Sequence, residues 1–129
     1  MNEYIGVIEA AIRSCLLMIA YQLNIDRKSQ EIAFISGRIE FVDGYSLDFK
    51  EFVERVNGGI EKYKYAYHFR KEDQLVFRYD NAPDPRAKRF DGFPHHQHTE
   101  SGEIIPSPGM DFSEILDRVQ DWILSGWDT

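Results

Sequence analysis

The segment over residues 93–98, with sequence FPHHQH, holds three of the chain's four histidines. Imidazole rings titrate near neutral pH, so a group of them suits general acid–base catalysis or the binding of a transition metal. In an extended segment His96 and His98 share one face, and His95 points the other way. With an acid such as Asp80, the pair could hold Zn²⁺ or Mn²⁺, although the chain lacks the ligand set of a standard zinc motif. Acid–base chemistry or contact with a phosphate is our leading interpretation, and metal binding and a structural hydrogen-bonded cluster are the alternatives.

A second polar stretch, residues 77–83 with sequence FRYDNAP, marks the point where a predicted strand runs into residues that stop a β-ladder. The Arg78 guanidinium can bind a phosphate with two hydrogen bonds, and Tyr79 or Asp80 can orient a partner or shift a proton. In the competing structural interpretation, Asp80 and Asn81 make an Asx-type turn and Arg78 pairs with Asp80. The candidate catalytic residues of the two segments are Arg78, Tyr79, Asp80, His95, His96 and His98.

The predicted strand over residues 61–71 separates aromatic from basic side chains, because alternate residues of a strand point to opposite faces. The aromatic face suits packing against helices, and it holds Tyr63, Tyr65, Tyr67 and Phe69. The basic face is typical of a surface that follows a phosphate backbone, and an ordinary solvated sheet face is the alternative. The candidate RNA-binding residues, which include one from an earlier strand, are Arg38, Lys62, Lys64, His68 and Arg70.

Several elements must position these residues. Apolar residues at spacings of three and four predict a helix over residues 5–23. A final helix begins at Asp111, with Glu114 as its capping-box partner. The strand-like runs between the helices, separated by turn signals, cover residues 32–42, 45–56, 61–71 and 74–81, with 102–106 as a candidate fifth strand.

Short connections join antiparallel neighbours, so the pattern predicts an α+β fold. We expect an antiparallel meander sheet of four to five strands, with the N- and C-terminal helices packed on one face, in a single domain over residues 1–129. A three-residue loop over residues 71–73 would set Phe69 opposite Leu75 and Lys64 opposite Asp80.

Composition narrows the class of protein. The chain has 129 residues, a net charge of −7 and one cysteine, Cys15, which excludes an internal disulfide. No apolar run approaches the roughly 20 residues that cross a membrane, and the N-terminus lacks the basic start of a signal peptide. The acidity lies in residues 91–129, which hold one Lys or Arg against eight Asp and Glu. We therefore expect a cytoplasmic protein whose middle third can still present a basic surface.

The two polar stretches, in this order, resemble those of the TumE-type toxins of small bacterial and archaeal toxin–antitoxin modules. The similarity covers roughly residues 32–123 and includes further matching positions: Gly37-Arg38, Ser46-Leu47, Phe49, Glu51-Phe52-Val53, Tyr65 and Tyr67-His68. The family often has His-His-Pro after Ala-Pro, whereas this chain has Asp84-Pro85-Arg86. The resemblance implies a growth-inhibiting partner of a cognate antitoxin, distantly related to the RelE/ParE-like mRNA endonucleases and gyrase poisons.

Our leading hypothesis is a toxin that cleaves RNA without a metal or any other cofactor. His96 and His98 would serve as base and acid, with His95 in reserve, and Arg78 would hold the phosphate. The first alternative is a non-catalytic module that binds gyrase, the ribosome or another protein. Its binding surface would consist of the apolar first helix and the acidic residues 91–129. The second is a metal-dependent hydrolase that uses the histidines and Asp80. The chain is expected to be a monomer or a homodimer, without a membrane partner.

Overall fold

The computed structural model describes residues 1–127 and contains two α-helices, seven strands and two short 3₁₀ turns. The helices are α1 (Asn2–Arg13) and α2 (Phe112–Trp127), and the 3₁₀ turns are η1 (Val42–Gly44) and η2 (Pro85–Ala87). The strands are β1 (Met18–Arg27), β2 (Ile32–Phe41), β3 (Tyr45–Val56), β4 (Gly59–Lys71), β5 (Gln74–Asp80), β6 (His96–Thr99) and β7 (Ile104–Pro106).

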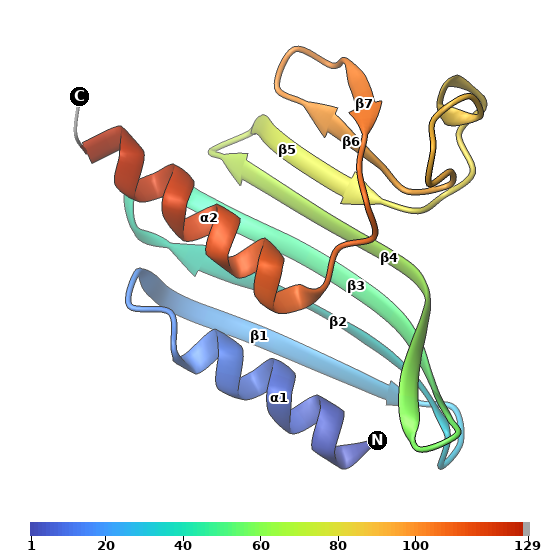
Figure 1. Ribbon diagram of the computed structural model, residues 1–129. Helices are drawn as coiled ribbons and strands as arrows, with labels where there is room; N and C mark the ends of the chain where they lie inside the picture. The colour runs from blue at the N-terminus through green and yellow to red at the C-terminus, as the bar shows by residue number, and fades with distance from the viewer. Residues whose placement is uncertain (128–129) are drawn as a thin grey trace.

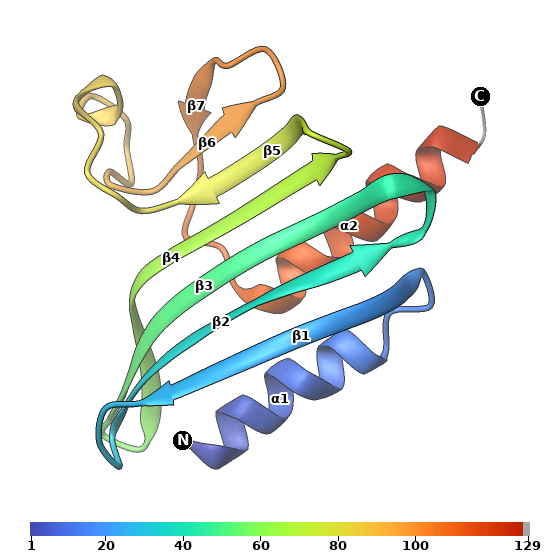
Figure 2. The same cartoon turned by 180° about the vertical axis from the view of Figure 1, so that it is seen from behind.

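The strands form one open antiparallel sheet in which their spatial order equals their order in the chain. Both helices lie on the same side of this sheet, in front of it in Figure 1 and behind it in Figure 2. The other face is free of helices, and we call it the open face. The α+β class, the antiparallel sheet and the terminal helices are confirmed, but the expected number of strands is wrong, because the sheet has seven.

The N-terminal region differs most from expectation, because the helix predicted over residues 5–23 ends at Arg13. Residues Met18–Arg27 form the edge strand β1 instead, and Tyr21, Leu23 and Ile25 alternate with exposed polar residues along it. A period of two and a period of 3.6 share many positions in an apolar run this short. Antiparallel pairing with β2 favours the strand over the helix for these residues.

The turn between β4 and β5 has two residues rather than three, since Lys71 pairs with Gln74. A register shift after Phe69 adds one residue on β5, so Phe69 lies opposite Phe77 and the aromatic face stays continuous. The expected pairs of Phe69 with Leu75 and of Lys64 with Asp80 are therefore wrong. Ala66 lies opposite Asp80.

The core lies between the helices and the aromatic face of the sheet. Tyr65, Tyr67 and Phe69 are buried there as predicted, whereas Tyr63 is half exposed. The capping box of α2 is confirmed, because Asp111 and Glu114 each accept a hydrogen bond from the other's backbone N–H. The helix side chains that close the core are Ile8, Ile12, Phe112, Ile115, Leu116, Val119 and Ile123.

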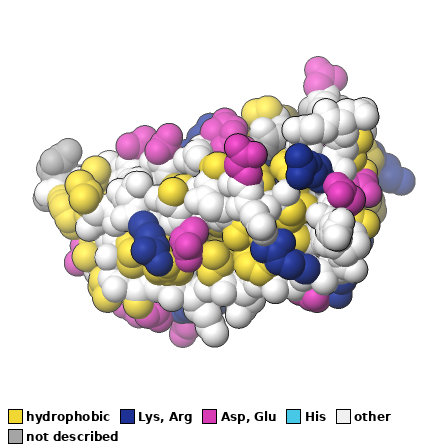
Figure 3. All heavy atoms as spheres, turned by 90° about the horizontal axis from the view of Figure 1, so that it is seen from below, with side chains coloured by type: hydrophobic (Ala, Val, Ile, Leu, Met, Phe, Trp, Pro, Cys, Tyr) yellow, Lys and Arg dark blue, Asp and Glu magenta, His cyan; other side chains and the backbone are white. Residues whose placement is uncertain are grey.

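The side of the molecule where α1 and β1 lie exposes apolar surface. Leu16 and Ile19 are 94% and 65% exposed, and Val7 on α1 is half exposed. Figure 3 shows this side from below, with hydrophobic side chains interspersed among charges of both signs. Among residues 1–127, neither helix has the length and apolar content that a membrane span requires.

Candidate active site on the open face

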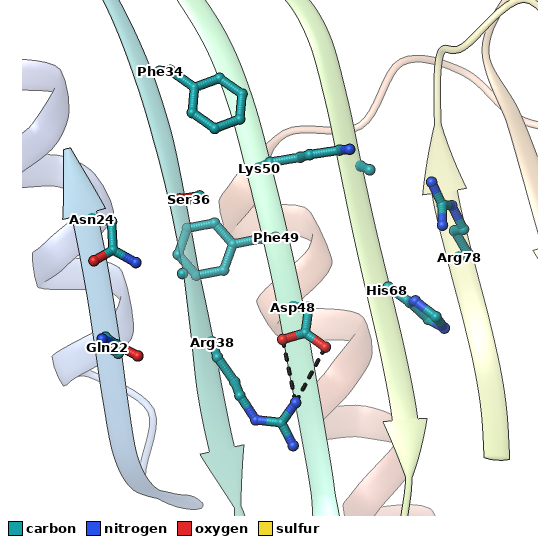
Figure 4. A pocket seen from close by; sticks show the side chains of 12 residues that line it. Gln22, Asn24, Phe34, Ser36, Arg38, Asp48, Phe49, Lys50, His68 and Arg78 are labelled. Carbon is teal, nitrogen blue, oxygen red and sulfur yellow. Dashed lines mark hydrogen bonds and ion pairs between the residues drawn. The ribbon is translucent and has the colours of Figure 1, made fainter. Parts of the chain in front are cut away.

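The strand register sets side chains, all polar except Ala66, in two parallel rows across the open face. The first row crosses six neighbouring strands through Gln22, Arg38, Asp48, His68, Arg78 and His98. The second, two residues along each strand, consists of Asn24, Ser36, Lys50, Ala66, Asp80 and His96. Figure 4 shows much of the first row, with His68 extending from β4 toward β5 and Arg78.

The two rows end in a compact polar cluster of Arg78, Asp80, His96 and His98. Arg78 Nε donates to Asp80 Oδ2 over 2.8 Å. His96 Nε2 lies 3.1 Å from Asp80 Oδ1 and 3.1 Å from His98 Nε2, and His98 Nε2 lies 3.6 Å from Asp80 Oδ2. The histidine segment therefore folds back beside Arg78, so the candidate base and acid lie next to the candidate phosphate-binding residue.

The members of this cluster differ in their access to solvent. The side chains of Asp80 and His96 are 5% and 1% exposed, while those of Arg78 and His98 are 37% and 21% exposed. A cavity of about 460 Å³ opens over the cluster, walled by the loop after β5 and by β4; its lining includes His68, Leu75, Pro83, Asp84 and Pro85. A ligand in this cavity meets Arg78 and His98 first.

Hydrogen bonding fixes the orientation of the inner histidine. His96 Nδ1 lies 2.8 Å from the Pro94 carbonyl oxygen, which can only accept, so Nδ1 carries the proton and donates it. The His96 Nε2 lone pair then points at His98 Nε2 and at the Asp80 carboxylate. His98 Nε2 therefore meets two acceptors, and either a proton on His98 Nε2 or a cation must lie between them.

Two imidazoles flank Arg78 on the open face, His68 from β4 and His98 from β6. Burial lowers the pKa of His98, although the nearby Asp80 carboxylate opposes the shift. Burial also lowers the pKa of His68, helped by the positive charges of Arg70 and Arg78. Both rings are therefore mainly neutral at pH 7 and can accept a proton.

The remaining basic residues of the open face differ in how far they are neutralised. Arg38 lies 3.4 Å from an Asp48 carboxylate oxygen, and Arg70 forms a close ion pair with the same carboxylate. Lys50 and Lys64 are exposed. A shallow groove of about 560 Å³ is lined in part by Arg38, Asp48 and Lys50 and reaches Arg78 (Figure 4).

Lys62 does not lie on the open face, and our expectation for it is wrong. The register between β3 and β4 shifts so that Phe52 pairs with Lys64 and Val53 with Lys62, which leaves Tyr63 as an extra residue. The shift turns Lys62 to the helix side, where Nζ donates to the Tyr67 hydroxyl over 2.6 Å.

On the helix side Lys62 joins a buried polar cluster around Glu51, which is 0% exposed. Tyr67 donates a 2.5 Å hydrogen bond to Glu51, and Tyr4 of α1 donates another. Lys62 also donates to the Met110 carbonyl just before α2. The sequence carried a signal for this cluster that our reasoning missed, since strict alternation along β3 places Glu51 at an inward position.

Two predicted site residues lie apart from the open-face cluster. His95 Nδ1 lies 2.9 Å from the Tyr65 hydroxyl on the helix side, and burial lowers its pKa. Tyr79 is 3% exposed and packs in the core, where burial raises its pKa. Neither side chain reaches the cavity in which His98 and Arg78 lie.

The contacts of the competing structural interpretation are also present. Asp80 Oδ1 accepts from the Ala82 N–H over 3.0 Å, which is an Asx turn, and Arg78 pairs with Asp80. Asn81 ties β5 to β4 by accepting from the Tyr65 N–H and donating to the Tyr63 carbonyl. The turn fixes the Asp80 carboxylate in place, and the histidines then converge on it.

Comparison with known proteins gives one match. The family model described as Toxin TumE matches residues 8–123, which run from α1 into α2 and include every residue of the open-face cluster. No curated protein and no solved structure matches the chain.

Proposed function

The chain belongs to the TumE toxin family. On that premise we propose that the chain is the toxin of a toxin–antitoxin module and that it cleaves RNA without a metal ion. A cognate antitoxin is then its protein partner. The observation that carries the RNA proposal is the row His68, Arg78 and His98, in which one guanidinium lies between two imidazoles at the mouth of a cavity.

RNA cleavage by the 2′-hydroxyl needs a base, a stabiliser of the pentacoordinate phosphorus and an acid. His98 Nε2 faces the inner cluster, so its Nδ1 is the atom that accepts the 2′-hydroxyl proton. The 2′ oxygen forms its bond to phosphorus, and the bond to the 5′ oxygen breaks. Arg78 binds the non-bridging oxygens and stabilises the extra negative charge.

The 5′ oxygen takes its proton from His68, on the other side of Arg78. Burial, Arg70 and Arg78 lower the pKa of His68, so its acid form is the minor one in the free protein. The negative charge of a phosphate bound at Arg78 raises this pKa and, together with Asp48, favours the protonated form. His96, which we expected to transfer a proton, is 1% exposed, so in this mechanism it positions His98 together with Asp80. The products are a 2′,3′-cyclic phosphate and a 5′-hydroxyl.

The open face supplies a path for the RNA backbone. Lys50 is exposed beside the groove that leads to Arg78, and Lys64 is exposed beside a neighbouring cavity that Lys50 and Arg78 also line. The family's histidines after Ala-Pro are replaced here by Asp84 and Pro85, which line the cavity wall. The imidazoles of this mechanism come instead from β4 and β6.

The test is incubation of the purified chain with RNA in excess chelator. We expect cleavage of RNA, no cleavage of the same sequence as DNA, and loss of activity in a His96→Ala, His98→Ala double variant. Activity retained in that variant would discard the histidine roles, and cleavage abolished by chelator would discard the metal-free mechanism.

The second candidate function is that of a non-catalytic protein-binding module. The observation that favours it is the edge strand β1, which leaves backbone hydrogen-bonding groups unpaired beside the exposed Leu16 and Ile19. Growth inhibition by such a module survives the double histidine substitution but is lost in an Ile19→Lys variant. The RNA-cleaving toxin gives the opposite pair of results.

A further inference from the structure

We propose that Asp80, His96 and His98 bind one transition-metal ion and that the bound ion inhibits RNA cleavage. The metal would be a reversible inhibitor rather than a resident cofactor. Only the inhibition rests on the proposed function, because metal binding follows from the geometry of the three side chains. Their ligand atoms lie within 4.8 Å of one another.

The distances within this set fit a tetrahedral ion. Ligands that bind Zn²⁺ at about 2.0–2.1 Å lie about 3.3–3.4 Å from one another at the corners of a tetrahedron. His96 Nε2 lies 3.1 Å from His98 Nε2 and 3.1 Å from Asp80 Oδ1. His98 Nε2 lies 3.6 Å from the second carboxylate oxygen, Oδ2, so a bound ion would also draw His98 toward the oxygen that it binds.

The surroundings orient the ligands as a metal site requires. A metal-binding imidazole commonly donates its second ring N–H to a carbonyl or carboxylate, which fixes its tautomer. His96 does so through Nδ1 and the Pro94 carbonyl. Asp80 is held by the Ala82 N–H at Oδ1 and by Arg78 at Oδ2. An ion would take the place of the proton that lies between His98 Nε2 and its two acceptors.

The donor set selects the class of ion. Two imidazoles and one carboxylate suit Zn²⁺, Co²⁺ or a similar transition metal better than Mg²⁺ or Ca²⁺, which prefer oxygen ligands. The fourth position opens onto the 460 Å³ cavity and can hold a water molecule. The Arg78 guanidinium, 2.8 Å from Asp80, opposes a second cation and keeps the affinity moderate.

The ion acts on the proposed mechanism through His98. Coordination at Nε2 leaves a neutral imidazole that carries its proton on Nδ1. This nitrogen then donates and no longer accepts the 2′-hydroxyl proton. The chemistry stops while Arg78 can still bind a phosphate.

The binding test is calorimetric titration of the purified full chain with Zn²⁺, followed by absorption spectra of the Co²⁺-loaded protein. We expect one ion per chain and visible bands typical of four-coordinate Co²⁺. His98→Ala should weaken binding by more than about tenfold, whereas His95→Ala, a change of the adjacent histidine on the other face, should leave it unchanged. Thermal unfolding of both variants confirms that they fold.

The inhibition test measures RNA cleavage with and without Zn²⁺. Saturating Zn²⁺ should lower the rate at least tenfold, and chelator should restore it. No binding, or equal binding by His98→Ala, would overturn the metal site. Faster cleavage with Zn²⁺ would overturn inhibition and identify a metal-dependent hydrolase. A chain that binds Zn²⁺ but cleaves no RNA under any condition would overturn the proposed function and the inhibitory role, while the site would stand.

Discussion

Two polar clusters occupy opposite faces of the same sheet, and they are built from similar chemical groups. On the helix side, Glu51 is completely buried, and two tyrosines and Lys62 surround it. On the open face, Asp80 is buried, and two histidines and Arg78 surround it. Each cluster thus pairs one carboxylate with one cation and two ring side chains.

The clusters differ in whether the side chains around the carboxylate are exposed to solvent. In the Glu51 cluster, the groups donate to one another and to the Met110 carbonyl, so they join α1 and the start of α2 to the sheet. In the open-face cluster, Arg78 and His98 remain partly exposed beside a cavity. Accessibility, rather than residue type, therefore separates a structural cluster from a candidate site.

Glu51→Gln should produce the largest effect and tests whether the Glu51 cluster is structural. The substitution leaves Lys62 without its buried counter-charge, so the free energy of unfolding should fall by about 3–5 kcal/mol. Urea unfolding measures this, with Glu54→Gln as the matched control on the same strand. An unchanged stability would mean that the Glu51 cluster does not hold the fold together.

Arg78→Gln should have the next largest effect, on chemistry rather than stability. Loss of a charged donor to the phosphate should slow RNA cleavage by about 10²–10³-fold. The same change removes a cation from beside Asp80, so Co²⁺ binding should become tighter. RNA cleavage rates and Co²⁺ titration measure the two effects. Slower cleavage together with weaker Co²⁺ binding would show that Arg78 only positions Asp80.

Tyr65→Phe sharpens the assignment of His95 to the structural side. The variant loses the hydroxyl that lies 2.9 Å from His95 Nδ1, so the free energy of unfolding should fall by about 1 kcal/mol. The rate of RNA cleavage should stay unchanged, because this pair lies on the helix side. A large loss of activity at unchanged stability would move His95 into the catalytic group.

Lys64→Ala should have the smallest effect and tests the path of the RNA. The variant loses one contact to the phosphate backbone of a single strand. The slope of log Kd against log salt concentration should therefore fall by about 0.7. Fluorescence anisotropy at several salt concentrations measures this. Lys28→Ala, at an exposed position just after β1, is the control and should change nothing.

Much of the sheet was predictable from period-two patterns and turn residues. Alternation along β4 placed Tyr65, Tyr67 and Phe69 in the core. The same reasoning failed for Lys62, because a register shift at Tyr63 reverses the faces before it, and no local pattern marks that shift. It also missed β1, where Ile19 and Leu23 fit helical spacing as well as a strand.

The candidate site was predictable in its parts but not in its division of roles. Extended geometry put His96 and His98 on one face, and β6 pairs with β5 so that both meet Asp80. Burial of His96 depends on the loop after β5, which sequence spacing cannot place. His68 was expected only to contact RNA, since its position beside Arg78 depends on the register of β4 and β5.

The most direct test of the account compares two neighbouring histidines on opposite faces of the sheet. RNA cleavage in excess chelator is measured for folded His98→Ala and His95→Ala proteins. We expect His98→Ala to cut at least a hundredfold more slowly than the unaltered chain and His95→Ala to cut at the same rate as that chain. Equal rates for the two variants, or a loss confined to His95→Ala, would contradict this expectation.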